Sequence, residues 1–260
     1  MEQEGLNAAC AAALKKYDFF RNRRRYFVYA CMAGCFCSIG MALACSAAAG
    51  FYSSEALRGA HRFMLGAMFT LSFTMIVFAG AELFTGNVLI MSIGVFQKKL
   101  KLFQAVGILA FCYFANIVGA VFMGFIISLA GIMEGQTGDM MLSLAGGKTA
   151  LSFSHGFFRG IMCNVMVCLG MWCVLKLKSE SAKMIVLFWA VIGFVVPGYE
   201  HSIANAGIFT MATFAKASSM DYQGLVLNML SVSLGNIVGG AVFVALVYWF
   251  SGRSAQKLEP

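Results

Sequence analysis

Apolar residues dominate six long stretches of the chain: roughly 26–48, 63–96, 104–132, 150–175, 184–214 and 224–250. A helix that crosses a bilayer needs about 20 mostly apolar residues, so each stretch is predicted to span a membrane. The second and fifth stretches are too long for one plain helix, and each contains glycines and a glutamate. In these two we predict a half-helix, a break and a second half-helix.

The two interruptions share one residue pattern. Glu82 precedes Asn87 by five residues, Glu200 precedes Asn205 by five, and the two pairs lie 118 positions apart. The tetrapeptide Asn-Ile-Val-Gly follows each pair, at 116–119 and at 236–239. The chain is therefore predicted to be duplicated. Because each half holds three spans, the second half must enter the membrane inverted, as in many channels and transporters.

Composition agrees with a membrane protein. The chain is 60% hydrophobic and 12% charged, with a mean hydropathy of +0.81, which excludes an ordinary soluble domain. Its net charge of +8 does not indicate nucleic-acid binding, because most Lys and Arg residues fall in alternate loops. Loops rich in Lys and Arg favour the cytoplasm, so both termini are predicted to be cytoplasmic. Lys216 is expected on the outer side of the membrane.

We expect four segments: a cytoplasmic N-terminal segment, two three-helix repeats and a cytoplasmic tail, at 1–25, 26–132, 150–250 and 251–260. For the first 20 residues, an amphipathic helix at the membrane surface and disorder are both open. Eight of the nine cysteines, all but Cys10, fall within predicted spans and are expected to pack as small apolar residues. Cys31 and Cys35 share a helix face, but no nearby His or carboxylate completes a metal site.

Polar groups in the two breaks indicate where a pore would run, because a charge in hydrocarbon is costly. His201 follows Pro197 and Gly198, where a helix should end, so its imidazole is predicted near the bilayer midplane. There it can exchange a proton with a passing weak acid. The second half-helices are predicted to begin near Asn87 and Ser202, with N-terminal N–H groups that favour anions.

Other polar residues leave alternatives open. Glu82 and Glu200 are expected to accept hydrogen bonds from backbone N–H groups of the breaks. Lys148 either draws anions or is an ordinary snorkelling lysine. Arg159 either reaches the membrane interface or pairs with a neighbouring carboxylate, and pairing is favoured. The amide of Asn164 must bond either to a broken-helix backbone or to the pore.

The motifs resemble the formate/nitrite transporter family. The resemblance rests on Ala-Glu-Leu-Phe-Thr-Gly-Asn at 81–87, Gly-Ile-Met-Cys-Asn at 160–164 and Gly-Tyr-Glu-His-Ser-Ile-Ala-Asn at 198–205. It implies an all-α, aquaporin-like protomer of six transmembrane helices and a homopentamer in a bacterial inner membrane. It also implies a selective channel or transporter for small anions, with no cofactor and no catalytic residue.

The resemblance assigns roles by position. It makes His201 the central pore histidine, Lys148 the vestibule lysine, Thr85 the threonine of the first break, and Asn164 a further pore residue. Two apolar constrictions are implied: Phe73, Leu83 and Phe194 on the cytoplasmic side, and Phe69, Phe84 and Val167 on the outer side. Glu82 in place of the Asp that is usual in the formate branch favours hydrosulfide as substrate, with nitrite and formate as alternatives.

The expected mechanism is protonation or hydrogen bonding of the anion at His201, so that the rate rises as external pH falls. A neutral acid crosses apolar rings more cheaply than an anion does. A passive channel and a proton-coupled carrier both remain open. An aquaporin-type solute channel would need Asn-Pro-Ala at both breaks, yet the only prolines are Pro197 and Pro260. An intramembrane enzyme is disfavoured because no cysteine lies close to His201 in the sequence.

Overall fold

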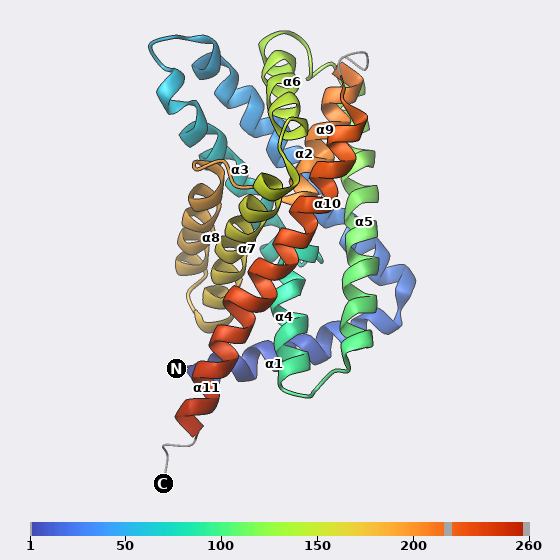
Figure 1. Ribbon diagram of the computed structural model, residues 1–260, viewed down its shortest axis with the longest axis vertical. Helices are drawn as coiled ribbons and strands as arrows, with labels where there is room; N and C mark the ends of the chain where they lie inside the picture. Colours follow the sequence, from blue (N-terminus) through green and yellow to red (C-terminus); the bar gives the residue numbers. More distant parts are fainter. Residues whose placement is uncertain (1, 216–219, 257–260) are drawn as a thin grey trace.

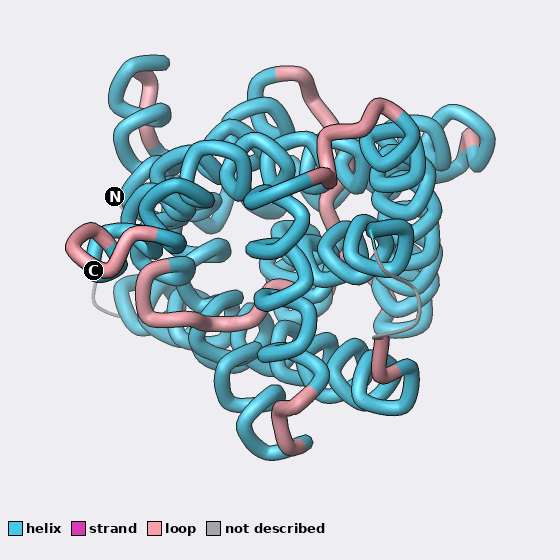
Figure 2. Tube along the Cα trace, turned by 90° about the horizontal axis from the view of Figure 1, so that it is seen from above, coloured by secondary structure: helices cyan, strands magenta, loops and turns pink. Residues whose placement is uncertain are grey.

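The structure of the protein is a computed structural model that describes residues 2–215 and 220–256. Lys216 and the tail residues 257–260 lie outside the described residues. Within them, the chain consists of helices joined by short loops, with no strand (Figure 2). The prediction of an all-α protein is therefore confirmed.

Each half of the chain contains one short leading helix, two long helices and one helix that is broken in two (Figure 1). The first half comprises α1 (Glu2–Arg21), α2 (Arg23–Ser53), α3 (His61–Phe78), α4 (Phe84–Phe96) and α5 (Leu102–Leu129). The second comprises α6 (Gly135–Thr149), α7 (Phe153–Lys176), α8 (Glu180–Val195), α9 (Ser202–Ala215) and α10 (Tyr222–Val238). A π-helical segment (Gly239–Leu246) and α11 (Val247–Gln256) prolong α10, and a 3-10 turn (Arg58–Ala60) precedes α3.

The spans follow the predicted pattern. The long apolar helices α2, α5 and α7, together with the continuous helix that begins at α10, are each long enough to cross a membrane. The other two spans are the broken ones, α3 with α4 and α8 with α9. The segment Arg58–Phe78, which contains α3, is also long and apolar enough to cross a membrane by itself. The shorter halves α4 and α9 are also apolar.

A glycine terminates the first half of each broken helix. Gly80 has φ +79° and Gly198 has φ +81°, in the left-handed region that a side chain disfavours. The residue after each glycine donates its N–H to a carbonyl of the preceding helix: Ala81 to Ile76, and Tyr199 to Phe194, both at 2.9 Å. The same turn therefore ends α3 and α8.

A buried asparagine fixes each break against the long helices. Asn116 on α5 accepts the N–H of Phe84 at 2.8 Å, and its amide donates to the carbonyls of Ala30 at 2.7 Å and Glu82 at 2.8 Å. All four groups are thereby satisfied without water, as a membrane interior requires.

Asn236 on α10 repeats this arrangement in the second half. It accepts the N–H of Ser202 at 3.0 Å and donates to the carbonyls of Gly160 at 2.8 Å and Glu200 at 3.0 Å. The two Asn-Ile-Val-Gly tetrapeptides thus occupy equivalent positions in the two halves of the chain, which agrees with the predicted duplication.

Glycines allow the two long helices of each half to touch. A Cβ added at Gly119 would overlap the carbonyl of Cys31, and one added at Gly239 would overlap the carbonyl of Ile161. These contacts join α2 to α5 and α7 to the helix continuing from α10. On both helices a second small residue lies four positions earlier, at Ala115 and Gly235, and such spacing permits close approach.

The N-terminal segment forms α1 and buries Leu6, Ala9 and Ala13. Of the two alternatives for this segment, disorder is wrong. The segment is a helix that packs against α4 and α7 of its own chain, and its contact with the membrane surface stays a prediction. In Figure 1, α1 crosses the lower end of the bundle, where α11 also lies. The two ends of the described chain therefore share one side, and the assignment of that side to the cytoplasm stays a prediction.

We predict that Gly119→Val destabilises the protein by about 1–3 kcal/mol, because the added carbons would force α2 and α5 apart. Thermal unfolding of the detergent-solubilised protein measures this effect. Gly107→Val on the same helix is the control, since a Cβ there has no neighbour within 4 Å. Equal loss of stability in both variants would refute this account of the packing.

Candidate functional site

Two cavities open toward opposite ends of the bundle. One, of about 490 Å³, is lined by Lys148, Glu200 and His201, and we call it the outer vestibule after the predicted orientation. The other, of about 570 Å³, is lined by Lys16 and Glu82, and we call it the inner vestibule. In Figure 1, α6, which carries Lys148, lies at the top, and α1, which carries Lys16, lies at the bottom.

A narrow apolar space lies between the vestibules. It has a volume of about 10 Å³, roughly that of one water molecule. His201 lines both this space and the outer vestibule, whereas Phe73 and Leu83 line both this space and the inner vestibule. A hydrated ion therefore cannot pass between the vestibules without losing its water.

Apolar side chains from α2, α3, α7, α8 and the first break surround this space. Phe69, Phe73, Leu83 and Val167, four of the six predicted constriction residues, each line it. Phe194 lines it too, but from the outer side: it also borders the outer vestibule, and its ring packs against Phe69 with the centroids 6.3 Å apart. The predicted cytoplasmic position of Phe194 is corrected, because α8 ends at the outer vestibule rather than at the inner one.

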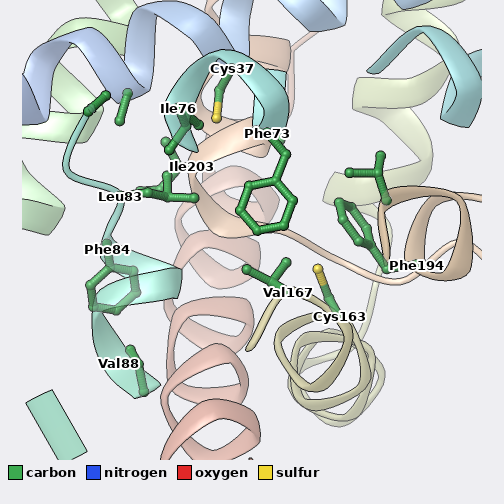
Figure 3. Close-up of a cluster of buried hydrophobic side chains, with 14 of the residues drawn as sticks. Cys37, Phe73, Ile76, Leu83, Phe84, Val88, Cys163, Val167, Phe194 and Ile203 are labelled. Atoms are coloured by element: carbon green, nitrogen blue, oxygen red, sulfur yellow. The ribbon is translucent and has the colours of Figure 1, made fainter. Parts of the chain in front are cut away.

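Phe84 does not line either vestibule or the space between them. Its ring instead packs against Tyr113 on α5, with the centroids 4.9 Å apart. Leu83 still has an extended backbone and points toward Phe73, whereas Phe84, the next residue, begins α4 and points elsewhere (Figure 3). Adjacent side chains diverge at such a junction, so the predicted role of Phe84 in the outer constriction is corrected.

His201 lies at the junction of the outer vestibule and the narrow space, with only 5% of its surface exposed. Its Nδ1 accepts the N–H of Ala204 at 3.2 Å, and its Nε2 lies 2.9 Å from Oγ1 of Thr85. Because a backbone N–H can only donate, the neutral ring carries its hydrogen on Nε2. The ring also stacks on Phe194 at 6.0 Å, so its plane is fixed.

Two of the predicted pore residues are buried beside the passage. Thr85 is fully buried and contacts the passage only through His201. Asn164 is also fully buried, and its amide donates to the carbonyls of Thr85 at 3.2 Å and Asn236 at 2.6 Å. Of the two partners considered for Asn164, the structure shows the broken-helix backbone, and Asn164 lines none of the three spaces.

The carboxylate at the second break is held by a lysine and an asparagine. Lys148 donates to both oxygens of Glu200 at 2.9 Å, and Asn205 donates to one of them at 2.6 Å. The expectation that Glu200 accepts backbone N–H groups is therefore wrong. The reason is that α6 brings an ammonium group to the break, and a full charge is a stronger partner.

The first break contains the same cluster. Lys16 donates to the two oxygens of Glu82 at 2.7 Å and 2.6 Å, and Asn87 donates to one of them at 2.8 Å. The expectation that Glu82 accepts hydrogen bonds from backbone N–H groups is therefore wrong as well. Lys16 lies in the predicted N-terminal segment 1–25 and was not among the predicted site residues, so its contact with Glu82 was missed. The available signal was that each lysine stands in the segment before the first long span of its half.

The leading helices α1 and α6 are thus equivalent parts of the duplication. Each delivers one lysine to the break of its own half, Lys16 to Glu82 and Lys148 to Glu200. The repeated unit therefore extends beyond the predicted bounds 26–132 and 150–250 to include these helices.

Arg159 lines the outer vestibule, as does Arg62. Within the described residues neither arginine forms an ion pair. The predicted pairing of Arg159 with a carboxylate is wrong, because Glu200, the acidic residue that shares this vestibule, is already bound to Lys148.

We predict that Lys148→Met lowers the free energy of unfolding by about 3–5 kcal/mol, because it leaves the carboxylate of Glu200 buried without its counter-charge. Adding Glu200→Gln should restore most of this loss. Denaturant unfolding in mixed micelles measures both effects. Lys183→Met, which breaks an exposed pair with Glu180, is the control and should cost at most about 1 kcal/mol. A double variant no more stable than Lys148→Met would contradict the pairing argument.

Comparison with known proteins agrees with these features. The sequence profile of the family described as "Formate/nitrite transporter" matches residues 3–250. The nitrite transporter NirC of Escherichia coli (strain K12) is 33% identical over 96% of this chain and 91% of its own length. A probable formate transporter of Methanothermobacter thermautotrophicus is 29% identical over 87% of this chain and 88% of its own length.

Solved structures resemble the fold closely. A structure described as "FNT family ion channel" superposes with a TM-score of 0.88 and is 29% identical, covering 96% of this chain and 99% of its own. A structure described as "Pentameric formate channel with formate bound" superposes with a TM-score of 0.78 and is 28% identical, covering 89% and 98%. The chain therefore belongs to the formate/nitrite transporter family, and it is a membrane transport protein rather than an enzyme.

Proposed function

We propose that each chain forms one passage for small monovalent anions of weak acids, with nitrite and formate as its main substrates. The observation that carries this proposal is the position of His201, between a wide polar vestibule and a narrow apolar space. The names of the relatives, a nitrite transporter and a probable formate transporter, support the same class of substrate.

The narrow space determines the mechanism. An anion that enters it loses its water and faces Phe73, Leu83 and Val167, none of which can replace that water. A weak acid avoids this cost by crossing as the neutral molecule. At the entrance to the space, the Nε2–H of His201, which also faces Thr85, can donate a hydrogen bond to the anion. A proton that the ring passes to the anion is replaced from the water on the entry side. The N-termini of α4 and α9 add a positive potential there.

The assembly is proposed to be a homopentamer in a bacterial inner membrane, with both termini in the cytoplasm. The solved formate channel of the same fold is pentameric. In the single chain, large apolar side chains such as Phe103, Phe114 and Val226 are more than 60% exposed, so lipid or neighbouring copies must cover them.

The choice among anions needs a direct comparison. Hydrosulfide, which the motif around Glu82 favours, stays a prediction that the relatives reported above do not test. Flux of nitrite, formate, hydrosulfide and chloride through the reconstituted protein would rank the four anions. Single-channel currents would indicate a channel, whereas saturating flux without unitary currents would indicate a proton-coupled carrier.

We predict that His201→Phe reduces nitrite and formate flux into proteoliposomes at least about 10-fold, because the imidazole N–H that can donate to the anion at the entrance to the narrow space would be lost. His201→Asn keeps a hydrogen-bond donor but cannot transfer a proton, so it separates these two roles. Size-exclusion chromatography must show an unchanged assembly for both variants. Full flux through His201→Phe would remove the histidine from the mechanism.

We also predict that flux rises as the pH on the entry side falls, because a lower pH supplies the proton that the anion needs. A pH-sensitive dye trapped in the liposomes should report one proton entering with each nitrite or formate ion. Liposomes without protein, measured in parallel, correct for the acid that crosses lipid directly. Protein-dependent flux that ignores pH and moves no proton would show that the anion crosses in its charged form.

A further inference from the structure

The outer vestibule contains two arginines that the mechanism above does not use. Arg62 is the second residue of α3, and Arg159 lies in the first half of α7, yet both line the same cavity of about 490 Å³ as His201. Both side chains are exposed to this cavity or to the solvent at its mouth. An anion on its way to His201 must therefore pass them.

The two arginines supply the uncompensated positive charge in this vestibule. Lys148 also lines it, but its ammonium binds both oxygens of Glu200 at 2.9 Å, so the two charges largely cancel. Arg62 and Arg159 form no ion pair within the described residues. Attraction of an anion from solvent therefore depends more on the arginines than on the lysine.

Both arginines flank the break that precedes His201. Nη1 of Arg62 lies 3.5 Å from the point that a Cβ would occupy at Gly198, so the missing side chain leaves room for the guanidinium. The backbone carbonyl of Arg159 accepts the N–H of Glu200 at 3.2 Å, which fixes α7 against the same break. The two arginines thus lie next to one short segment, residues 198–200, and both line the vestibule.

The chemistry of guanidinium selects a class of anion. Its planar fork donates two parallel N–H groups, which match the two oxygens of a carboxylate or a similar planar anion. An anion with a single acceptor atom, such as hydrosulfide or chloride, can meet both parallel N–H groups only with bent, weaker hydrogen bonds. An ammonium, by contrast, acts as a point charge and makes no such distinction.

We propose that Arg62 and Arg159 form an entry site that binds planar anions with two oxygens, such as nitrite and formate, before these anions lose their water at His201. The site favours such anions over hydrosulfide and chloride. This inference rests on the proposed function and adds the residues that select the substrate class on the outer side.

The first test measures uptake into proteoliposomes as a function of anion concentration. Arg62→Lys and Arg159→Lys keep the charge but remove the fork, so each should raise the half-saturating concentration of nitrite and formate about 3- to 10-fold. The value for hydrosulfide should change less than about 2-fold, and the maximal rates should stay close to those of the wild type. Arg58→Gln is the control, because Arg58 belongs to the same face but does not line the outer vestibule.

The second test does not depend on flux. Phenylglyoxal reacts with accessible guanidinium groups, and mass spectrometry reports the extent of labelling at each arginine of the wild-type protein in detergent. Nitrite or formate should slow the labelling of Arg62 and Arg159, whereas the same concentration of chloride should not. Labelling of Arg58 should be insensitive to all three anions.

The two tests distinguish a failure of the entry-site proposal from a failure of the proposed transport function. Equal shifts for nitrite and hydrosulfide in the lysine variants would overturn the selection by shape, and so would equal protection by chloride and formate. Wild-type kinetics in both lysine variants, without protection of either arginine, would overturn the site while leaving the passage intact. A wild-type protein that carries none of these anions would instead refute the proposed function, and protection from phenylglyoxal would then still decide whether the arginines bind anions.

Discussion

The structure depends on how it neutralises two carboxylates inside segments that are otherwise apolar. An isolated charge at this depth is costly, and removing one partner of a buried pair leaves that cost uncompensated. Lys16 and Asn87 meet Glu82, while Lys148 joins Glu200, in clusters with donor–acceptor distances of 2.6–2.9 Å. Each cluster fixes one leading helix to one broken helix, so the breaks can persist without water.

These clusters also shape the passage. Because each break is anchored, the two half-helices α4 and α9 present their N-termini toward the middle of the bundle, and His201 is held at one of these ends. Apolar rings separate the histidine from the inner vestibule, leaving a space of about 10 Å³. The charges at the breaks are thus neutralised, and the centre of the passage is narrow and apolar. Such a passage favours a species that crosses in its neutral form.

The duplication explains why the two breaks are held in the same way. The residues that face the passage nonetheless differ between the two breaks. Asn116 and Asn236 make equivalent hydrogen bonds at the two breaks. The equivalence ends at the residues that face the passage, because the position after Glu82 is Leu83 whereas the position after Glu200 is His201. One break thus contributes an apolar gate and the other contributes the titratable group.

The sequence by itself determined the spans, the two breaks, the duplication and the family, because these follow from hydropathy, glycine positions and motif spacing. It also indicated His201 as a candidate pore residue, because an ionisable residue beside a break in an apolar segment is rare. Only the tertiary structure decided the partner of Glu82 and the outer position of Phe194. It also showed that Phe84 turns away from the passage and that Arg159 is unpaired in the outer vestibule. These features depend on which helices lie side by side and on the direction of single side chains, and neither is encoded in local periodicity.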